Sequence, residues 1–145
     1  MAWFEAQGAT VTSIDLSAGM LAVARRTADG PLLMMDMRAL AFRSASFDGA
    51  WCCASLLHLP KSEAPQALRA IRRVLKPGGM LMLCIQEGAF EGRNGGYVEG
   101  VMRFFARYTE EEMKVMLTQS QFTVVTIEKD QVKQRIWLAF VCIAA

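Results

Sequence analysis

Short apolar runs alternate with helix-like segments along this chain, and the alternation predicts an α/β protein. The clearest stretch spans residues 47–88. Its apolar run 49–54 has the composition of a strand buried on both faces, and residues 80–85 form a second such run. Between them, apolar side chains recur at helical spacing at Ala64, Leu68, Ile71 and Leu75. Strand, helix and strand in this order form a crossover unit of a parallel sheet.

Local signals mark the ends of this helix. Ser62 is of a type that caps helix N-termini, so we expect the helix to begin there. Pro77, Gly78 and Gly79 are expected to end it, because proline cannot continue the hydrogen-bond ladder and glycine accepts a left-handed turn.

The flanking segments continue the pattern in both directions. Toward the N-terminus we expect the end of a helix at 1–7, a strand at 9–14, a helix capped by Ser17 and a strand at 32–35. Toward the C-terminus, Thr109 and Glu112 form a capping-box pattern, and the helix that follows should end with Gln121 in a left-handed conformation. Residues 122–128 and 137–143 are predicted to be two final strands joined by a turn at 129–134.

Composition narrows the class. A chain of 145 residues is the size of one domain, and we expect a single, if incomplete, domain over 1–145. The hydrophobic content is 53%. It comes in runs far shorter than the roughly 20 residues of a membrane span. Residues 1–11 lack the basic start of a secretory signal.

Charge and cysteine usage further restrict the class of protein and its partners. A net charge of +2 does not favour a nucleic-acid partner. The four cysteines have no CxxC spacing and are expected to be buried, reduced thiols. This pattern predicts a cytoplasmic protein without a metal site.

Two acidic residues stand where an open α/β sheet binds its ligands. Asp15 and Asp36 each follow a predicted parallel strand, so both should lie at the carboxyl edge of the sheet. A carboxylate accepts strong hydrogen bonds and can hold a diol.

These motifs resemble one family. FDGAWCCASLLHLP, the helix end RRVLKPGG and the pattern ID-L-S-x-x-ML are similar to class I S-adenosylmethionine-dependent methyltransferases, in particular the type 11-like domain. The resemblance implies a Rossmann-like three-layer α/β sandwich, mostly parallel with an antiparallel C-terminal hairpin. It also implies S-adenosylmethionine as cofactor and methyl transfer to a small molecule. The family's first strand and its glycine-rich loop have no counterpart before Asp15, so we expect an N-terminally truncated chain whose activity as it stands is open.

The resemblance also assigns cofactor contacts. Asp15 would bind the ribose hydroxyls, with Leu16 against the adenine, and Asp36 would accept from the adenine amino group. The full set of expected cofactor-binding residues is Asp15, Leu16, Ser17, Asp36, Met37, Cys53 and Ala54.

Candidates for the substrate side follow the two central strands. His58, the sole histidine, and Glu87 are candidate catalytic residues, although a histidine here also suits a purely structural role. Arg103 and Tyr108 are candidate substrate contacts. In this segment aromatic rings could pack on a small substrate, and Arg103 and Arg107 could hold an anionic group. The glycine-rich residues 88–96 are expected to form either a mobile loop over the substrate or an ordinary surface loop.

The sequence is compatible with several structural outcomes and functions. Loss of a central strand leaves three outcomes: a closed-up sheet, pairing with a second chain, or a fragment of a longer enzyme. For a fragment that folds alone we expect a homodimer through exposed strand edges. A non-catalytic remnant or interaction module of the same fold is the alternative function, followed by an NAD-binding oxidoreductase domain.

Overall fold

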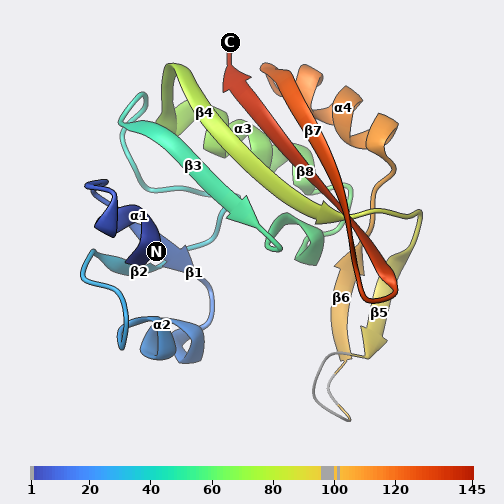
Figure 1. The fold of residues 1–145 in the computed structure, drawn as a ribbon, viewed down its shortest axis with the longest axis horizontal. Coiled ribbons are helices and arrows are strands. Elements are labelled where there is room, and N and C mark those ends of the chain that lie inside the picture. Colours follow the sequence, from blue (N-terminus) through green and yellow to red (C-terminus); the bar gives the residue numbers. More distant parts are fainter. Residues whose placement is uncertain (1, 96–99, 101) are drawn as a thin grey trace. The chain divides into compact units, whose positions relative to one another are not determined.

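The computed structural model describes residues 2–95, 100 and 102–145, which form two compact units divided between Ala41 and Phe42. The first contains α1 (Ala2–Ala6), β1 (Ser13–Asp15), α2 (Ala18–Ala24) and β2 (Leu32–Met34). The second contains the rest of the described elements (Figure 1).

A two-stranded parallel sheet forms the centre of the first unit. Asp15 of β1 is paired with Met34 of β2. The expected strand at 9–14 is wrong at its start, since β1 begins only at Ser13. Ser13 donates its N–H to the carbonyl of Pro31 at 2.9 Å, and proline offers no N–H in return, so the ladder does not extend backwards. Among the described residues of this unit, Leu40 alone is a buried hydrophobic residue.

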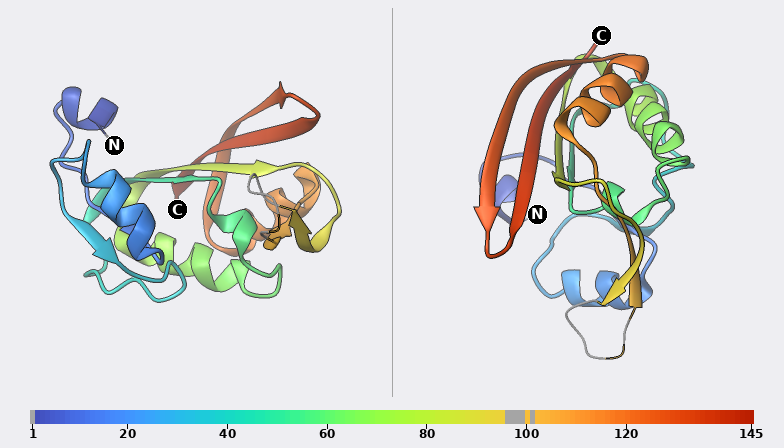
Figure 2. Two further views of the ribbon diagram at one scale, coloured as in Figure 1. Left: turned by 90° about the horizontal axis from the view of Figure 1, so that it is seen from below. Right: turned by 90° about the vertical axis from the view of Figure 1, so that its right-hand side faces the viewer.

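A four-stranded sheet forms the second unit, in the order β3 (Phe47–Cys53), β4 (Leu75–Gln86), β8 (Arg135–Ala144), β7 (Phe122–Val132). β3 and β4 are parallel, whereas β4–β8 and β8–β7 are antiparallel. The helices α3 (Ala64–Val74) and α4 (Glu110–Gln119) lie on the same side of this sheet (Figure 2). The crossover and the antiparallel pair at the edge therefore match the sequence prediction.

Alternating side chains of the sheet build the core beneath these helices. Leu81, Leu83 and Ile85 of β4 are fully buried, as are Leu138 and Phe140 of β8. The helices contribute their own apolar positions, which are Ala64, Ala67, Leu68, Ile71, Val74, Met113 and Leu117. Exposed apolar side chains remain on these strands at Trp51, Met80, Val125 and Ile143.

The ends of α3 differ in part from the prediction. Ser62 does not cap it: the capping position is Glu63, and no side chain caps there. Ser62 as cap would place Pro65, which has no N–H, at one of the two usual donor positions. The other donor, Ala64, bonds to the Pro60 carbonyl at 3.1 Å.

The far end of α3 comes earlier than predicted. The helix ends at Val74, because Leu75, expected on the helix, is already extended (φ −75°, ψ 139°) and begins β4. Gly78 has φ +76°, in the left-handed region that favours glycine. A side chain at Gly79 would lie 2.9 Å from the Lys76 carbonyl oxygen, so this position requires glycine.

The glycine-rich stretch after β4 is more ordered than predicted. β5 (Glu91–Gly95) and β6 (Met102–Ala106) form an antiparallel hairpin that pairs Gly92 with Phe105. The loop prediction is therefore wrong for these residues, because regular pairing with β6 holds the chain extended. The last predicted loop residue, Gly96, lies outside the described residues.

The C-terminal half of the second unit agrees with the local signals. The Thr109 hydroxyl accepts from the Glu112 N–H at 3.1 Å, and the Glu112 carboxylate accepts from the Thr109 N–H at 2.8 Å. These two bonds complete the capping box. Gln121 has φ +63°, as expected. The turn predicted over 129–134 is much shorter, since β7 and β8 extend to Val132 and Arg135 and leave only two residues between them.

The four cysteines are all free thiols. Cys52 and Cys142 are buried as predicted, Cys84 is half-buried, and Cys53 is exposed, so the expectation of burial is wrong for Cys53. Successive side chains of a strand point to opposite faces, so Cys53 faces away from the core that the neighbouring Cys52 enters.

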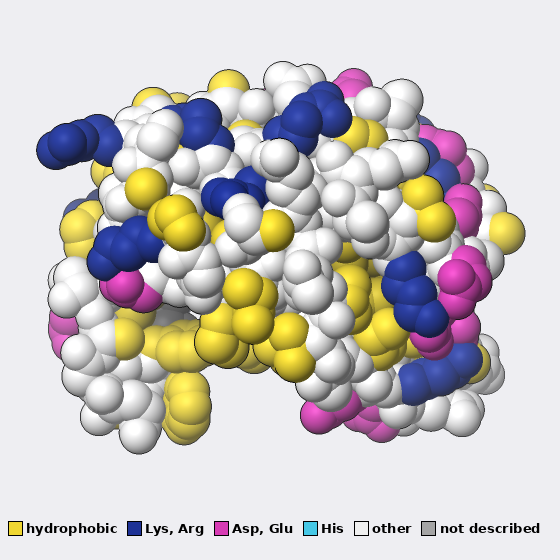
Figure 3. All heavy atoms as spheres, turned by 90° about the horizontal axis from the view of Figure 1, so that it is seen from above, with side chains coloured by type: hydrophobic (Ala, Val, Ile, Leu, Met, Phe, Trp, Pro, Cys, Tyr) yellow, Lys and Arg dark blue, Asp and Glu magenta, His cyan; other side chains and the backbone are white. Residues whose placement is uncertain are grey.

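In the described part of the chain, no helix combines the length and the apolar composition that a membrane crossing requires. Charged side chains of both signs appear on the face drawn in Figure 3, where acidic and basic groups are mixed along its right-hand side.

Candidate functional site

Asp15 and Asp36 lie at the same rim of the first unit. Each follows a strand of the parallel pair, and Asp15 is paired with Met34, two residues before Asp36. The N–H of Met35 donates to the Asp15 carbonyl at 3.2 Å, which ties the two strand ends together. The predicted juxtaposition of these two residues is therefore present.

The Asp15 carboxylate has room for a ligand. Its Oδ1 accepts from the Ser17 N–H at 2.8 Å, and Ser17 in turn caps α2 by accepting from the Met20 N–H at 3.2 Å. No hydrogen bond to its second oxygen is found among the described residues. Leu16, beside it, is 60% exposed and offers an apolar surface.

The Asp36 carboxylate is already partly engaged. It accepts from the Arg38 backbone N–H at 2.8 Å and forms a two-pronged ion pair with the Arg38 guanidinium. These hydrogen bonds hold the pKa of Asp36 below its usual value. Met37, the other expected adenine contact, lies between the two in the chain and is half-buried.

A small hollow lies behind this rim, between β1 and α2. Its volume is about 220 Å³, and its lining consists of Ser13, Ile14, Asp15, Met20, Leu21, Ala24 and Leu32. Apart from Asp15 and Ser13 this lining is apolar, so Asp15 is the charged group at its edge.

In the second unit, Cys53 is the last residue of β3 and Ala54 follows it. Ala54 has φ +54°, and its N–H donates to the Cys84 carbonyl at 3.0 Å. Cys84 is paired with Cys53 across the strands. Burial, together with the nearby Cys53, raises the pKa of Cys84 to about 11, so this thiol stays protonated at neutral pH.

Both ring nitrogens of His58 are occupied. Nδ1 lies 2.8 Å from the Phe104 carbonyl oxygen. That oxygen only accepts, so Nδ1 carries the proton. Nε2 lies 3.0 Å from Nη2 of Arg103. Because the guanidinium only donates, Nε2 is the acceptor and the ring is neutral.

The neutral ring agrees with its surroundings. Burial lowers the pKa of His58, the hydrogen bond to Phe104 opposes that effect, and the charge of Arg103 adds to it. As arranged, His58 positions Arg103 rather than presenting a free base.

Glu87 and Tyr108 lie next to each other beyond β4, where they form an isolated parallel bridge. Glu87 is ion-paired with Lys129 at 2.7 Å. The Tyr108 hydroxyl is buried and has no hydrogen-bond partner among the described residues. Burial, with Glu91 and Glu112 nearby, raises the pKa of Tyr108.

Three residues near Glu87 and Tyr108 were not predicted from the sequence as site residues. They are Gln86, Phe105 and Arg135. Gln86, the last residue of β4, is buried, and its Oε1 accepts from Arg107 at 3.3 Å and from Arg135 at 2.8 Å. The centre of the Phe105 ring lies 5.9 Å from the guanidinium carbons of both Arg103 and Arg135. A polar residue that ends an all-apolar strand, as Gln86 does, was the signal available in the sequence.

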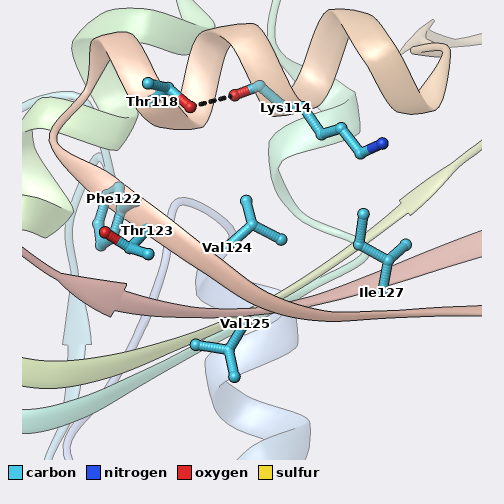
Figure 4. Close-up of a pocket in the computed structure, with 7 residues that line it drawn as sticks. All are labelled: Lys114, Thr118, Phe122, Thr123, Val124, Val125 and Ile127. Atoms are coloured by element: carbon cyan, nitrogen blue, oxygen red, sulfur yellow. Dashed lines mark hydrogen bonds between the residues drawn. The ribbon is translucent and has the colours of Figure 1, made fainter.

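A second hollow is a groove between α4 and β7, with a volume of about 620 Å³ (Figure 4). Val124 and Ile127 point into it toward α4, and Val125 points away. Its basic side chain, Lys114, is ion-paired with Glu110 and Glu111. Because it lacks converging polar groups, we do not regard this groove as the functional site.

The predicted site residues thus form two groups. Asp15, Leu16, Ser17, Asp36 and Met37 lie at one rim of the first unit. Cys53, Ala54, His58, Glu87, Arg103 and Tyr108 belong to the second unit, where His58 contacts Arg103 and Glu87 bridges to Tyr108.

Comparison with known proteins decides the family. The family described as "Methyltransferase domain" matches residues 1–83, which is more than half of the chain. The chain belongs to this family. Its cofactor is S-adenosylmethionine.

Relatives of the methyltransferase domain share its sequence over part of their length. A malonyl-[acyl-carrier protein] O-methyltransferase from Erwinia pyrifoliae is 41% identical over 95 residues, covering 61% of this chain and 36% of that protein. A ubiquinone biosynthesis O-methyltransferase from Xanthomonas oryzae is 38% identical over 82 residues, covering 52% and 34%. The chain therefore spans about a third of the length of these curated relatives.

Solved methyltransferase structures share the fold. The 1,6-didemethyltoxoflavin-N1-methyltransferase of Burkholderia thailandensis, with bound 1,6-didemethyltoxoflavin and S-adenosylhomocysteine, superposes with a TM-score of 0.78 at 23% identity. The match covers 98% of this chain and 64% of that one. The PH0226 protein of Pyrococcus horikoshii gives 0.78 at 21% identity, covering 96% and 73%. The methyltransferase domain described here thus has a Rossmann-like α/β fold.

Proposed function

We propose that this chain is the cofactor-binding core of an enzyme that transfers a methyl group from S-adenosylmethionine to a small molecule. The observation that carries the proposal is the placement of Asp15 and Asp36 at one rim of a parallel strand pair, in a chain that belongs to the methyltransferase family. Relatives named for malonyl-[acyl-carrier protein] and ubiquinone biosynthesis support transfer to an organic acceptor.

The residues of the first unit suit the adenosine half of the cofactor. Asp15 has an oxygen without a partner among the described residues and can accept from a ribose hydroxyl. Leu16, exposed beside it, can cover one face of the adenine. Asp36 is the weaker contact, because Arg38 already occupies much of its hydrogen-bonding capacity.

The chemistry places few demands on the protein. The cofactor supplies a methyl group already activated by its sulfonium leaving group. The chain's own task is to hold the acceptor in line and exclude water, and a general base is needed only for a protonated acceptor. Glu87 and His58 are the candidates for that base. Each must first release its partner, Lys129 or Arg103.

Titration calorimetry with S-adenosylhomocysteine tests this proposal. We expect saturable binding to the full chain, at least about tenfold weaker in Asp15→Asn, because charge-assisted hydrogen bonds to the ribose are lost. Asp29→Asn is the matched control, since Asp29 is exposed on the loop between α2 and β2. Equal affinity in Asp15→Asn and the control contradicts the assignment of Asp15.

A non-catalytic interaction module of the same fold is the second candidate. It is favoured by the sparse core of the first unit and by the strand pairing, since in the described residues β1 pairs only with β2 and β3 only with β4. Titration that shows no heat with either S-adenosylhomocysteine or NADH supports this candidate. The family assignment removes the support for an NAD-binding oxidoreductase.

The unpaired edges also lead us to propose a homodimer, formed when the outer edge of β3 pairs with a second copy. Size-exclusion chromatography with light scattering is expected to show twice the chain mass of 16.1 kDa. A compact monomer that melts cooperatively contradicts the dimer and supports a single domain over 1–145.

Four free thiols further suit the cytoplasm, which fractionation of cells expressing the native chain can test.

A further inference from the structure

Three arginines of the second unit lie around Gln86, at the carboxyl end of β4, and around the Phe105 ring. Arg103 and Phe105 are alternate residues of β6, so their side chains leave the same side of that strand, and Arg107 follows just beyond its end. Arg135 comes from the start of β8 and lies against the same Phe105 ring. Segments far apart in the sequence thus bring Arg107 and Arg135 together at Gln86, and Arg103 shares the Phe105 ring with Arg135.

Neutral groups hold these arginines. Arg107 and Arg135 both donate to the single amide oxygen of buried Gln86, at 3.3 and 2.8 Å, and Arg103 donates to His58 at 3.0 Å. None of the three forms an ion pair within residues 2–95, 100 and 102–145.

The acidic side chains of the same region have other partners. Lys129 engages Glu87, and Lys61 engages Glu112. Glu91 accepts from the Lys61 backbone N–H at 2.9 Å. The positive charge of the three arginines is therefore not matched by a carboxylate in the described structure.

The surroundings also position the Arg107 side chain. The guanidinium carbon of Arg107 lies 5.2 Å from the centre of the Phe90 ring. A side chain at Gly88 would lie 3.2 Å from Arg107 Cδ, so glycine leaves room for it. Two like charges beside one uncharged oxygen repel each other, and that repulsion is relieved by an anion. The planar fork of arginine matches carboxylate and phosphate oxygens.

We propose that Arg103, Arg107 and Arg135 form a binding site for a carboxylate or phosphate group of the methyl acceptor. That the anion belongs to a methyl acceptor rests on the proposed function. That the three arginines bind an anion rests on the geometry of the second unit alone. Phe105, which is buried, would support Arg103 and Arg135 at this site. The enzyme would favour acidic over neutral acceptors.

Direct titration with small aromatic anions tests the site without cofactor. Benzoate represents a carboxylate, phenyl phosphate a phosphate, and benzamide the neutral counterpart. We expect one of the two anions to bind saturably, benzamide not to bind, and affinity to fall as ionic strength rises. Arg107→Gln and Arg135→Gln should each weaken the anion by about tenfold or more, because a charge-assisted hydrogen bond is lost.

Arg93→Gln is the matched control, because Arg93 pairs with Phe104 and so leaves the opposite side of the same hairpin. Arg135→Lys, which keeps the charge but not the fork, guards against a folding defect and should bind more tightly than Arg135→Gln. Equal loss in Arg93→Gln, or no binding of either anion, overturns the proposal. If S-adenosylhomocysteine binds but the anions do not, this inference alone is overturned. If the anions bind but S-adenosylhomocysteine does not, the proposed function is overturned and the anion site remains.

Discussion

At the scale of single residues, two side chains of the second unit are in opposite states. All polar atoms of one side chain have hydrogen-bond partners, whereas the other has a buried polar atom without a partner among the described residues. His58 uses both ring nitrogens, one toward the Phe104 carbonyl and one toward Arg103. The hydroxyl of Tyr108 is buried without a partner in the described structure. These two opposite conditions predict opposite responses to change.

His58 should titrate below the ordinary histidine pKa of 6.5. Its folded-state pKa is lowered, so the unfolded chain binds the proton more readily. This pKa difference contributes to the free energy of unfolding. The contribution is present when the pH is above the ordinary histidine pKa, and it is lost as the pH falls through the folded-state pKa. Because the chain has one histidine, its ring proton resonance in NMR gives the folded-state pKa directly.

His58→Asn, which keeps a donor toward Phe104, is the comparison for this pH effect. We expect its melting temperature to depend less on pH, below the ordinary histidine pKa, than that of the wild type. A histidine midpoint above the ordinary value would show that the neutral tautomer described above is not the one present.

Tyr108→Phe should not destabilise the protein. The buried hydroxyl has no hydrogen bond in the described structure. Such a group costs free energy, so its removal is expected to leave the free energy of unfolding unchanged or raise it by up to about 1 kcal/mol. Urea denaturation measures the difference. A loss of more than about 1 kcal/mol would indicate a partner for the hydroxyl, whereas unchanged stability with weakened acceptor binding would support the predicted substrate contact.

At the scale of secondary-structure elements, local chemistry decided most boundaries. The capping box at Thr109 and the left-handed Gln121 were predictable, because each depends on residues within one turn of the helix end. The start of β1 and the absent cap at Ser62 were not, since proline residues at 31 and 65 altered the hydrogen bonds available to their neighbours. The β5–β6 hairpin was missed because its pairing, not its glycine-rich composition, holds the chain extended.

Gln121→Gly should stabilise the end of α4. Gln121 is left-handed, a conformation that is strained for glutamine and unstrained for glycine. We therefore expect a gain of about 0.5–1 kcal/mol in the free energy of unfolding, measured by urea denaturation. Gln119→Gly, at the last residue of the same helix, is the control and should lose up to about 1 kcal/mol in the free energy of unfolding. If both changes destabilise the protein equally, the conformation at position 121 is not the cause of any effect.

At the scale of the whole molecule, the candidate site could be predicted only in part. Asp15 and Asp36 were found because strand ends can be inferred from a sequence, and parallel strands place their carboxyl ends at one edge. The arginine cluster was predicted incompletely, since Arg103 and Arg107 were named from the sequence but Arg135 was not. Arg135 reaches Gln86, 49 positions earlier, through the antiparallel pairing of β8 with β4, a contact that no local pattern predicts.

The two compact units should differ in stability. Buried side chains are concentrated in the second unit, while Leu40 is the one buried hydrophobic residue described in the first. We therefore expect amide hydrogens of β1 and β2 to exchange with solvent much faster than those of β4 and β8. Hydrogen-exchange mass spectrometry measures this, and uniform protection across both sheets would contradict the expectation.

S-adenosylhomocysteine serves as the companion measurement. A ligand held by Asp15 should slow exchange in β1 and β2 more than in β4 and β8, because binding to the folded state stabilises the unit that carries the contact. Slowing confined to the second unit would place the ligand elsewhere.

The exposed position of Trp51 on β3 gives the molecule a built-in fluorescent reporter. Trp51 is 59% exposed and sits on the strand whose outer edge has no partner in the described chain. A strand that pairs with β3 would bring a side chain within about 5 Å of this residue and displace water from its indole. With Trp3 and Trp137 replaced by phenylalanine, emission that shifts toward shorter wavelength would then record completion of the sheet, whether the added strand comes from a peptide, a longer chain or a second copy.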